Sequence, residues 1–132
     1  MERLTALLDT HALLWALLEP AKLSTRARRV IEDPETRLLV SAATAWEIAT
    51  KYRLGRLPDA SDVVSDYARH LVRLRAEDVP VRSGHALVAG SMTIEHGDPF
   101  DRILAAQALT ESVPLVTNDP AFRTIEGLET LW

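Results

Sequence analysis

The chain has 132 residues, which is enough for one domain with a hydrophobic core and too short for two. Its apolar fraction of 47% and charged fraction of 26% are those of an ordinary globular protein, and the absence of cysteine excludes disulfide bonds and thiolate zinc sites. The net charge of −4 at pH 7 does not by itself favour nucleic acid as a partner.

The first apolar stretch, residues 4–18, is interrupted by Asp9 and His11 and is followed by no small-residue cleavage site. We interpret it as part of the core and not as a signal peptide or a membrane span. A chain without cysteine also suits a reducing compartment. We therefore expect one domain over residues 1–132, located in the cytoplasm and without membrane contact.

Strands and helices are predicted to alternate along the chain. Short apolar runs predict strands at residues 4–8, 37–40, 79–81, 114–117 and 128–131. Helical spacing and capping residues predict helices at residues 11–18, 24–31, 45–53, 62–75, 83–89 and 103–109, with a short helical turn at 120–122 and a loop at 94–98. Pro80 makes residues 79–81 an edge strand. The alternation indicates an α/β three-layer sandwich, in which helices flank a mostly parallel sheet of four to five strands.

Acidic residues recur where a predicted strand gives way to a helix. Asp9, Glu47 and Asp119 follow three of the strands, and Asp101 begins a late helix. The carboxyl ends of parallel strands share one edge of a sheet, so we expect these four side chains to converge there. A group of carboxylates without cysteine or an evident nucleophile favours a hard divalent cation, Mg²⁺ or Mn²⁺, of the kind used in phosphodiester hydrolysis.

Helix capping is the alternative interpretation of these acids. Thr44 and Glu47 match a capping box, while Asp98-Pro99 and Asp119-Pro120 match an N-cap followed by proline at the first helical position. A cap contributes about 1 kcal/mol. Two carboxylates about 6 Å apart repel each other by about 3 kcal/mol at an effective dielectric constant near 20. Capping alone therefore does not compensate for convergence unless the acids are well separated or a cation lies among them.

The basic and aromatic residues have simpler interpretations. Without the four acids, 15 acidic and 15 basic residues remain, so the negative charge is local. We interpret the basic groups as solvated helix faces and the tryptophans as core or interface residues, not as platforms for nucleic acid bases. The residues concerned are Lys51, Arg53, Arg56, Arg69, Arg73, Arg75, Trp15, Trp46 and Trp132.

Four segments together resemble a PIN-domain nuclease and, more narrowly, the toxin of a VapBC-type toxin–antitoxin pair. They are residues 8–15, 40–49, 98–102 and 115–119, which read LDTHALLW, VSAATAWEIA, DPFDR and LVTND. Each segment alone is weakly specific, but the four occur in order within a resemblance that runs from Leu4 to Trp132. The resemblance implies a PIN-like fold and an endoribonuclease dependent on Mg²⁺ or Mn²⁺. It also implies a homodimer that acts on RNA and is held inactive by a small antitoxin.

The resemblance assigns the catalytic and metal-binding roles to Asp9, Glu47, Asp101 and Asp119. Asp9 and Asp101 are expected to contact the ion, while Glu47 and Asp119 complete the pocket, orient water or hold a second ion. Three further residues are candidates for contacts around the ion or to the substrate, although Asp98 also serves as a helix cap: Thr117, Asp98 and Arg102.

Two other functions remain open from the sequence. A receiver-like phospho-acceptor domain also has acids at its strand ends. Such domains resemble one another in having paired acids after the first strand and a lysine after a late strand. Here Asp9 follows Leu8, and the only lysines are Lys22 and Lys51. A catalytically inactive binding module of the same fold is the third candidate, because spacing alone does not show that the acids meet.

Overall fold

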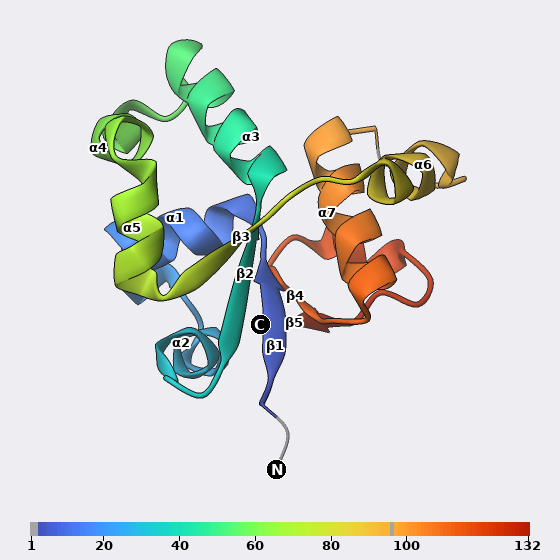
Figure 1. Ribbon diagram of the computed structural model, residues 1–132, viewed down its shortest axis with the longest axis horizontal. Coiled ribbons are helices and arrows are strands. Elements are labelled where there is room, and N and C mark those ends of the chain that lie inside the picture. Colours follow the sequence, from blue (N-terminus) through green and yellow to red (C-terminus); the bar gives the residue numbers. More distant parts are fainter. Residues whose placement is uncertain (1–2, 96) are drawn as a thin grey trace.

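Five parallel strands form the centre of the fold, in the order β3-β2-β1-β4-β5 (Figure 1). The computed structural model describes residues 3–95 and 97–132, so His96 in the predicted loop 94–98 lies outside the described residues. The strands are β1 (Thr5–Leu8), β2 (Arg37–Ser41), β3 (Ala76–Val79), β4 (Leu115–Val116) and β5 (Thr130–Leu131). The predicted parallel sheet is therefore confirmed.

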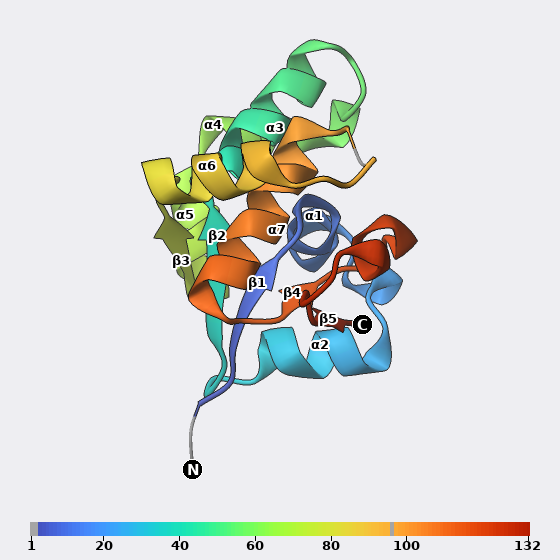
Figure 2. The same ribbon diagram turned by 90° about the vertical axis from the view of Figure 1, so that its right-hand side faces the viewer.

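Helices cover both faces of this sheet, which confirms the three-layer arrangement (Figures 1 and 2). On one side lie α1, α2, α4 and α5, and on the other α7 covers the sheet with α6 packed against it. The α-helices are α1 (Thr10–Leu18), α2 (Thr25–Glu32), α3 (Ala42–Arg53), α4 (Ser61–Ser65), α5 (Tyr67–Leu74), α6 (Ser83–Ser91) and α7 (Pro99–Glu111). Short 3-10 helices occupy Pro20–Lys22 (η1), Pro58–Ala60 (η2) and Pro120–Thr124 (η3).

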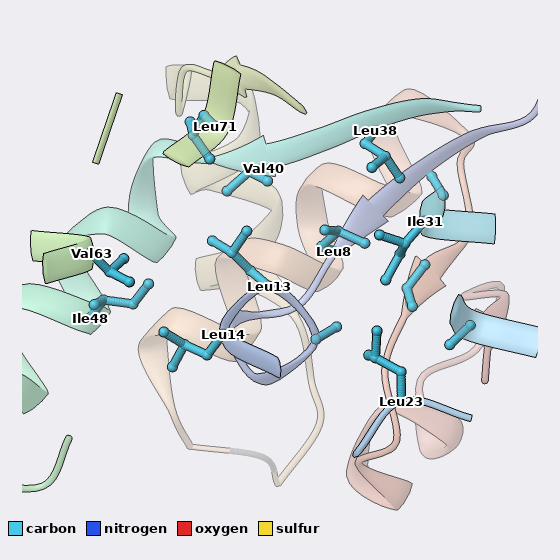
Figure 3. Packing of buried hydrophobic residues seen from close by; sticks show 14 of the residues in the cluster. Leu8, Leu13, Leu14, Leu23, Ile31, Leu38, Val40, Ile48, Val63 and Leu71 are labelled. Carbon is cyan, nitrogen blue, oxygen red and sulfur yellow. The ribbon is translucent and has the colours of Figure 1, made fainter. Parts of the chain in front are cut away.

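The central strands are apolar at successive positions because both of their faces are buried. In β1, Leu8 enters the core beneath α1 and α2, whereas Leu7 enters the core beneath α7. Val40 and Leu39 of β2 divide in the same way. Figure 3 shows the first of these cores. This alternation fixes the register of the sheet, since a slip by one residue would exchange the two sets of side chains.

Several predicted boundaries were wrong, including those of α7, which runs over Pro99–Glu111 and not over residues 103–109. The edge strand is Ala76–Val79 and not residues 79–81, because its backbone pairs with β2 at the solvated edge of the sheet, where an apolar run is not needed. The single helix predicted at residues 62–75 is interrupted at Asp66, although Val63 of α4 and Leu71 of α5 enter the same core. Helix α3 begins at Ala42, three residues earlier than predicted.

The early start of α3 overturns the capping box proposed for Thr44 and Glu47. The N-cap is Ser41, whose hydroxyl accepts a hydrogen bond from the Ala43 amide at 3.1 Å. Glu47 is therefore an interior residue of the helix and cannot contribute to its cap. The caps predicted at Asp98 and Asp119 are confirmed, with Pro99 and Pro120 as the first helical residues.

The strand order places a topological switch between β1 and β4. The chain runs outward from β1 through β2 to β3 and then returns to the opposite side of β1. Ligands of open α/β sheets bind at the carboxyl ends of the strands where such a reversal occurs. Helices α1, α3 and α7 all begin near this edge (Figures 1 and 2). Across the described ranges, no helix combines the length and apolar character needed to cross a membrane.

Candidate active site

Asp9 occupies the switch point between β1 and β4. It follows β1 directly, and its amide donates a hydrogen bond to the Val116 carbonyl of β4 at 3.0 Å. The residue as a whole is only 5% exposed. Its Oδ1 accepts the Ala12 amide at 2.7 Å, which caps α1, and its Oδ2 accepts the Thr117 hydroxyl at 2.5 Å. The predicted strand-end position of Asp9 is therefore also a helix-cap position, and the two interpretations apply to the same side chain.

The charge on Asp9 is unfavourable in this environment. Burial raises the pKa of Asp9 to about 6, an effect that the hydrogen bonds from Thr117 and Ala12 only partly oppose. The nearby charge of Asp101 contributes to the higher pKa, whereas His11 acts in the opposite direction. Asp9 and Asp101 thus lie close enough to interact electrostatically. Within residues 3–95 and 97–132, neither lysine nor arginine forms an ion pair with Asp9.

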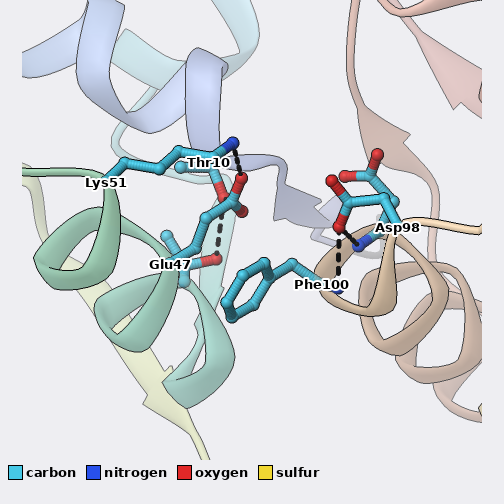
Figure 4. A network of polar contacts seen from close by, with 7 residues as sticks. Thr10, Glu47, Lys51, Asp98 and Phe100 are labelled. Atoms are coloured by element: carbon cyan, nitrogen blue, oxygen red, sulfur yellow. Dashed lines mark hydrogen bonds and ion pairs between the residues drawn. The ribbon is translucent and has the colours of Figure 1, made fainter. Parts of the chain in front are cut away.

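Glu47 reaches the same region from α3, with its side chain 3% exposed. Its Oε1 accepts the hydroxyl of Thr10, the residue after Asp9, at 2.5 Å. Its Oε2 forms an ion pair with the ammonium group of Lys51, one helical turn along α3 (Figure 4). Unlike Asp9, the buried carboxylate of Glu47 has a lysine side chain beside it that balances its charge.

The start of α7 supplies Asp98 and Asp101. Asp98 accepts the amides of Phe100 and Asp101 at 2.9 and 3.3 Å, so its carboxylate is the helix cap (Figure 4). Asp101 is the third helical residue and is half-buried. Arg102 donates to the backbone carbonyls of residues 89, 92 and 94 at 3.0, 2.7 and 3.3 Å. Arg102 therefore holds the segment that precedes α7, and a contact between Arg102 and the substrate stays a prediction.

Asp119 adjoins the site through Thr117. The Asp119 amide donates to the Thr117 hydroxyl oxygen at 3.0 Å, while the Asp119 carboxylate caps η3 through the Ala121 amide at 2.9 Å. A hollow of about 290 Å³ lies beside it, lined by His11, Trp15, Asn118, Asp119 and Pro120. A hollow of about 400 Å³ lies between the C-terminal ends of α2 and α5, away from these acids, and we do not associate it with the site.

The predicted acids thus form a chain of neighbours rather than one tight cluster. Asp9 interacts with Asp101, connects to Asp119 through Thr117, and adjoins Glu47 through Thr10. In the described part of the chain, no three or more acidic or histidine side chains are close enough to hold one ion together. The assignment of all four acids as ligands stays a prediction.

This donor set nevertheless fits Mg²⁺ or Mn²⁺. All donors are oxygen atoms, and the buried Asp9 carboxylate with its raised pKa lacks a lysine or arginine partner among the residues described above. Mg²⁺ retains several waters and needs only one or two protein carboxylates, with substrate phosphates as further ligands. Asp9 and Asp101 can provide that minimum.

Two functional candidates were missed or misinterpreted from the sequence. Thr10 follows Asp9 directly, so its hydroxyl offered a signal that was overlooked. Lys51 was assigned to a solvated face, but it is 26% exposed and pairs with Glu47, a spacing of four residues that is typical of helical ion pairs. Trp46 was predicted to be a core or interface residue, and its exposure of 67% excludes the core and leaves the interface a prediction.

The fold and the site together define a class of α/β proteins with carboxylates at the carboxyl edge of a parallel sheet. Comparison with known proteins identifies the class more closely, because residues 6–128 match the PIN domain family. Over 120 residues, 91% of each chain, the sequence is 31% identical to Ribonuclease VapC22 of Mycobacterium tuberculosis. It is 36% identical to Ribonuclease VapC16 of the same organism over 58 residues, 44% of this chain and 41% of that protein. The chain belongs to the PIN domain family, and within it to the VapC proteins.

Solved structures agree on the fold. A chain in the structure of DNA-bound VapBC from Salmonella typhimurium has a TM-score of 0.69 and 20% identity, with 97% of both chains covered. A chain in the structure of VapBC2 from Rickettsia felis bound to a promoter DNA fragment has a TM-score of 0.66 and 16% identity, with 97% of this chain and 98% of that chain covered. At these identities the likeness concerns the fold. Family membership replaces the receiver-like alternative.

Proposed function

We propose that the protein is a metal-dependent endoribonuclease, the toxin of a VapBC-type toxin–antitoxin pair. The observation that carries this proposal is the buried carboxylate of Asp9 at the switch point, electrostatically coupled to Asp101 in a chain of the VapC type. Capping alone does not require this buried charge, because a serine or asparagine would cap α1 equally well. The matched VapC proteins are named ribonucleases, which supports RNA as the substrate.

Mg²⁺ or Mn²⁺ would be held by Asp9 and Asp101, with Glu47 and Asp119 completing the pocket. When bound, such an ion neutralises a phosphodiester, lowers the pKa of water and stabilises the leaving oxygen. Among the residues of the chain, Thr117 keeps the Asp9 carboxylate in one orientation, and Asp98 fixes the start of the helix that carries Asp101. The amino-terminal end of α1 adds positive potential for a phosphate next to Asp9.

The same proposal includes two protein partners. The structural neighbours are described as VapBC proteins and as a toxin–antitoxin complex, which supports a small antitoxin as a partner. A homodimer and a cytoplasmic location are also proposed. Sedimentation at tens of micromolar tests the dimer, because a strictly monomeric chain would remove that claim and leave the nuclease unaffected.

RNA cleavage with Mn²⁺, with Mg²⁺ and with chelator tests the nuclease. We expect cleavage with either ion and none with chelator, and loss of cleavage in Asp101→Asn. Glu126→Gln is the matched control, because it also removes one negative charge but at an exposed position outside the site. Full activity in purified Asp101→Asn would contradict the role of Asp101 in ion binding. A wild-type protein that cleaves no RNA with either ion would favour the inactive binding module.

A further inference from the structure

An exposed aromatic pair lies beside the carboxylates. Trp46 of α3 is 67% exposed, and its ring packs edge to face against that of Phe100 in α7, with centroids 4.9 Å apart and planes at 77°. Trp46 directly precedes Glu47, and Phe100 directly precedes Asp101. In Figure 4 the Phe100 ring lies in the space between Glu47 and Asp98. The pair therefore links the two helices that bring acids to the site.

Burial in the core does not explain why a tryptophan occupies position 46. A tryptophan that exposes two thirds of its surface contributes little to the hydrophobic core, while Phe100 is half-buried and holds one side of the indole. Val72 and Leu87 are also strongly exposed, at 75% and 71%, but they are single aliphatic residues on α5 and α6. Scattered exposed aliphatic residues are ordinary, whereas a rigid aromatic surface next to the reacting region offers a specific contact.

The positive charge of Arg53 on α3 favours a nucleic acid, and not an apolar protein segment, as the ligand of the Trp46–Phe100 pair. Arg53 lies seven residues after Trp46, which places both on the same stripe of the helix and about 10 Å apart along its axis. Arg53 is exposed, and its guanidinium forms no ion pair within residues 3–95 and 97–132. Proteins that bind single-stranded nucleic acid combine aromatic platforms for bases with cations that follow the backbone.

We propose that Trp46, supported by Phe100, is the surface on which an unpaired RNA base stacks next to the scissile phosphate, with Arg53 contacting the backbone farther along the strand. This inference rests on the proposed ribonuclease function and deepens it. Stacking accepts every base, because each base has an aromatic face, but it requires a base that is free of its duplex partner. The platform therefore selects single-stranded or looped RNA near the cleaved bond.

Fluorescence anisotropy with labelled RNA tests the platform. The probes are a random-sequence RNA of 20 nucleotides, an abasic strand with the same ribose-phosphate backbone, and a duplex of equal length, each with Ca²⁺ as the ion. We expect Trp46→Ala to weaken binding of the base-containing single strand by about 5- to 140-fold and to leave the abasic strand unchanged. Trp46→Tyr should retain most of the affinity, and the wild type should prefer the single strand to the duplex.

Two controls make the result specific. Val72→Ala removes a comparably exposed apolar side chain and should not change binding of any probe. Arg53→Gln should weaken binding of the base-containing and abasic strands alike and reduce the salt dependence of binding by about 0.7 in log–log slope. Thermal melting should match the wild type for Val72→Ala and Arg53→Gln, whose side chains are exposed, and should fall slightly for Trp46→Ala, which loses the contact with Phe100.

Several outcomes would contradict the proposal that an RNA base stacks on Trp46. Wild-type affinity in Trp46→Ala, an equal loss on the base-containing and abasic strands, or no binding of any probe by the wild type would each do so. Unchanged RNA binding with weakened capture of the antitoxin would make the pair a protein-docking surface instead. Cleavage by the wild type with Mn²⁺ is measured separately, so the platform can fail while the nuclease stands.

Discussion

The two buried carboxylates nearest the switch point are held in opposite ways. Among the described residues, Asp9, 5% exposed, accepts hydrogen bonds from the Thr117 hydroxyl and the Ala12 amide and forms no ion pair with a lysine or an arginine. Glu47, with its side chain 3% exposed, receives a hydroxyl from Thr10 and also an ammonium group from Lys51. One acid therefore carries its own counter-ion, whereas the other would need the proposed metal ion to compensate its charge.

This difference indicates which acid would bind the proposed ion most directly. A buried charge is stable only when it is paired or coordinates a metal, and otherwise it shifts its pKa and becomes neutral. The pKa of Asp9, about 6, reflects that tendency. Glu47 has the Lys51 ammonium group beside it before any ion arrives. We therefore expect the ion to stabilise the Asp9 side of the site most strongly.

Replacement of Asp9 by asparagine should have the largest effect. Asparagine can accept the same Ala12 hydrogen bond, so the cap on α1 remains. Cleavage should fall by two orders of magnitude or more, because about 3 kcal/mol of lost transition-state stabilisation is already a factor of more than 100. Removal of the buried charge should at the same time stabilise the metal-free protein at pH 7 by up to about 3 kcal/mol, since one pKa unit is worth about 1.4 kcal/mol. Cleavage assays and urea unfolding measure the two quantities.

The pH dependence of stability follows from the same residue. The pKa of Asp9 in the folded state, about 6, exceeds its ordinary value, so between the two the folded state binds more protons than the unfolded state. The contribution of Asp9 to wild-type stability is therefore lost as the pH rises from about 4 to about 6. The advantage of Asp9→Asn should be absent near pH 4 and complete near pH 7. An equal advantage at both pH values would show that the charge of Asp9 is not its cause.

Metal affinity should fall steeply in acid. Below pH 6 the Asp9 carboxyl must lose a proton before it can bind an ion, so the apparent dissociation constant should rise about tenfold for each further pH unit. Isothermal titration with Mn²⁺ at pH 7, 6 and 5 measures this change. Repetition in two buffers with different ionisation enthalpies counts the released protons. A flat affinity between pH 7 and pH 5 would remove Asp9 from the ligands.

Metal binding should also raise the stability of the fold. An ion present at 100 times its dissociation constant stabilises the native state by about 2.7 kcal/mol. A thermal scan with and without millimolar Mn²⁺ measures this, and we expect an increase of several degrees in the wild type. Glu126→Gln should show the same increase, whereas Asp9→Asn should show much less. No shift in the wild type would count against a site in this region.

The parallel sheet and the placement of acids at its edge could be predicted because they depend on local patterns. Leu7 and Leu39 are apolar on the face opposite Leu8 and Val40, which is the signature of strands buried on both sides. The start of α3 could not be predicted in the same way. Thr44 and Ser41 are both good caps, and only the pairing of β2 up to Ser41 decides between them.

The pairings within the site were less accessible from the sequence. The bond between Thr117 and Asp9 joins residues 108 positions apart, and it exists because β4 returns beside β1. The exposure of Trp46 depends on the position of α3 relative to α7, which no local pattern encodes. By contrast, Lys51 follows Glu47 by four residues on a helix, so that pair was readable and was misjudged as solvent-facing.

Replacement of Lys51 by methionine tests whether Glu47 depends on its own cation. Among the described residues, the substitution leaves the buried carboxylate with the Thr10 hydroxyl and no cation. This should destabilise the metal-free protein by about 1–3 kcal/mol, less than for a fully buried pair because Lys51 is 26% exposed. Lys51→Arg retains the charge and should cost less. If Glu47 also reaches the ion, Mn²⁺ should raise the melting temperature of Lys51→Met more than that of the wild type. Equal increases would confine the ion to the Asp9 side.

Replacement of Thr117 by valine should have the smallest effect, and it tests the hydrogen bond that supports Asp9. Valine has nearly the same shape, so the change removes the hydroxyl that donates to Asp9 Oδ2 at 2.5 Å and accepts from the Asp119 amide at 3.0 Å. We expect a loss of about 1 kcal/mol in stability at pH 7, measured by urea unfolding, with less loss near pH 4 because Asp9 is then neutral. Thr117→Ser keeps the hydroxyl and should stay close to the wild type at both pH values.

In the Asp9→Asn background the cost of Thr117→Val should shrink, because a hydroxyl bonds a neutral amide more weakly than a carboxylate. An equal cost in both backgrounds would show that Thr117 acts through Asp119 or through packing, and that Asp9 has no dependence on it.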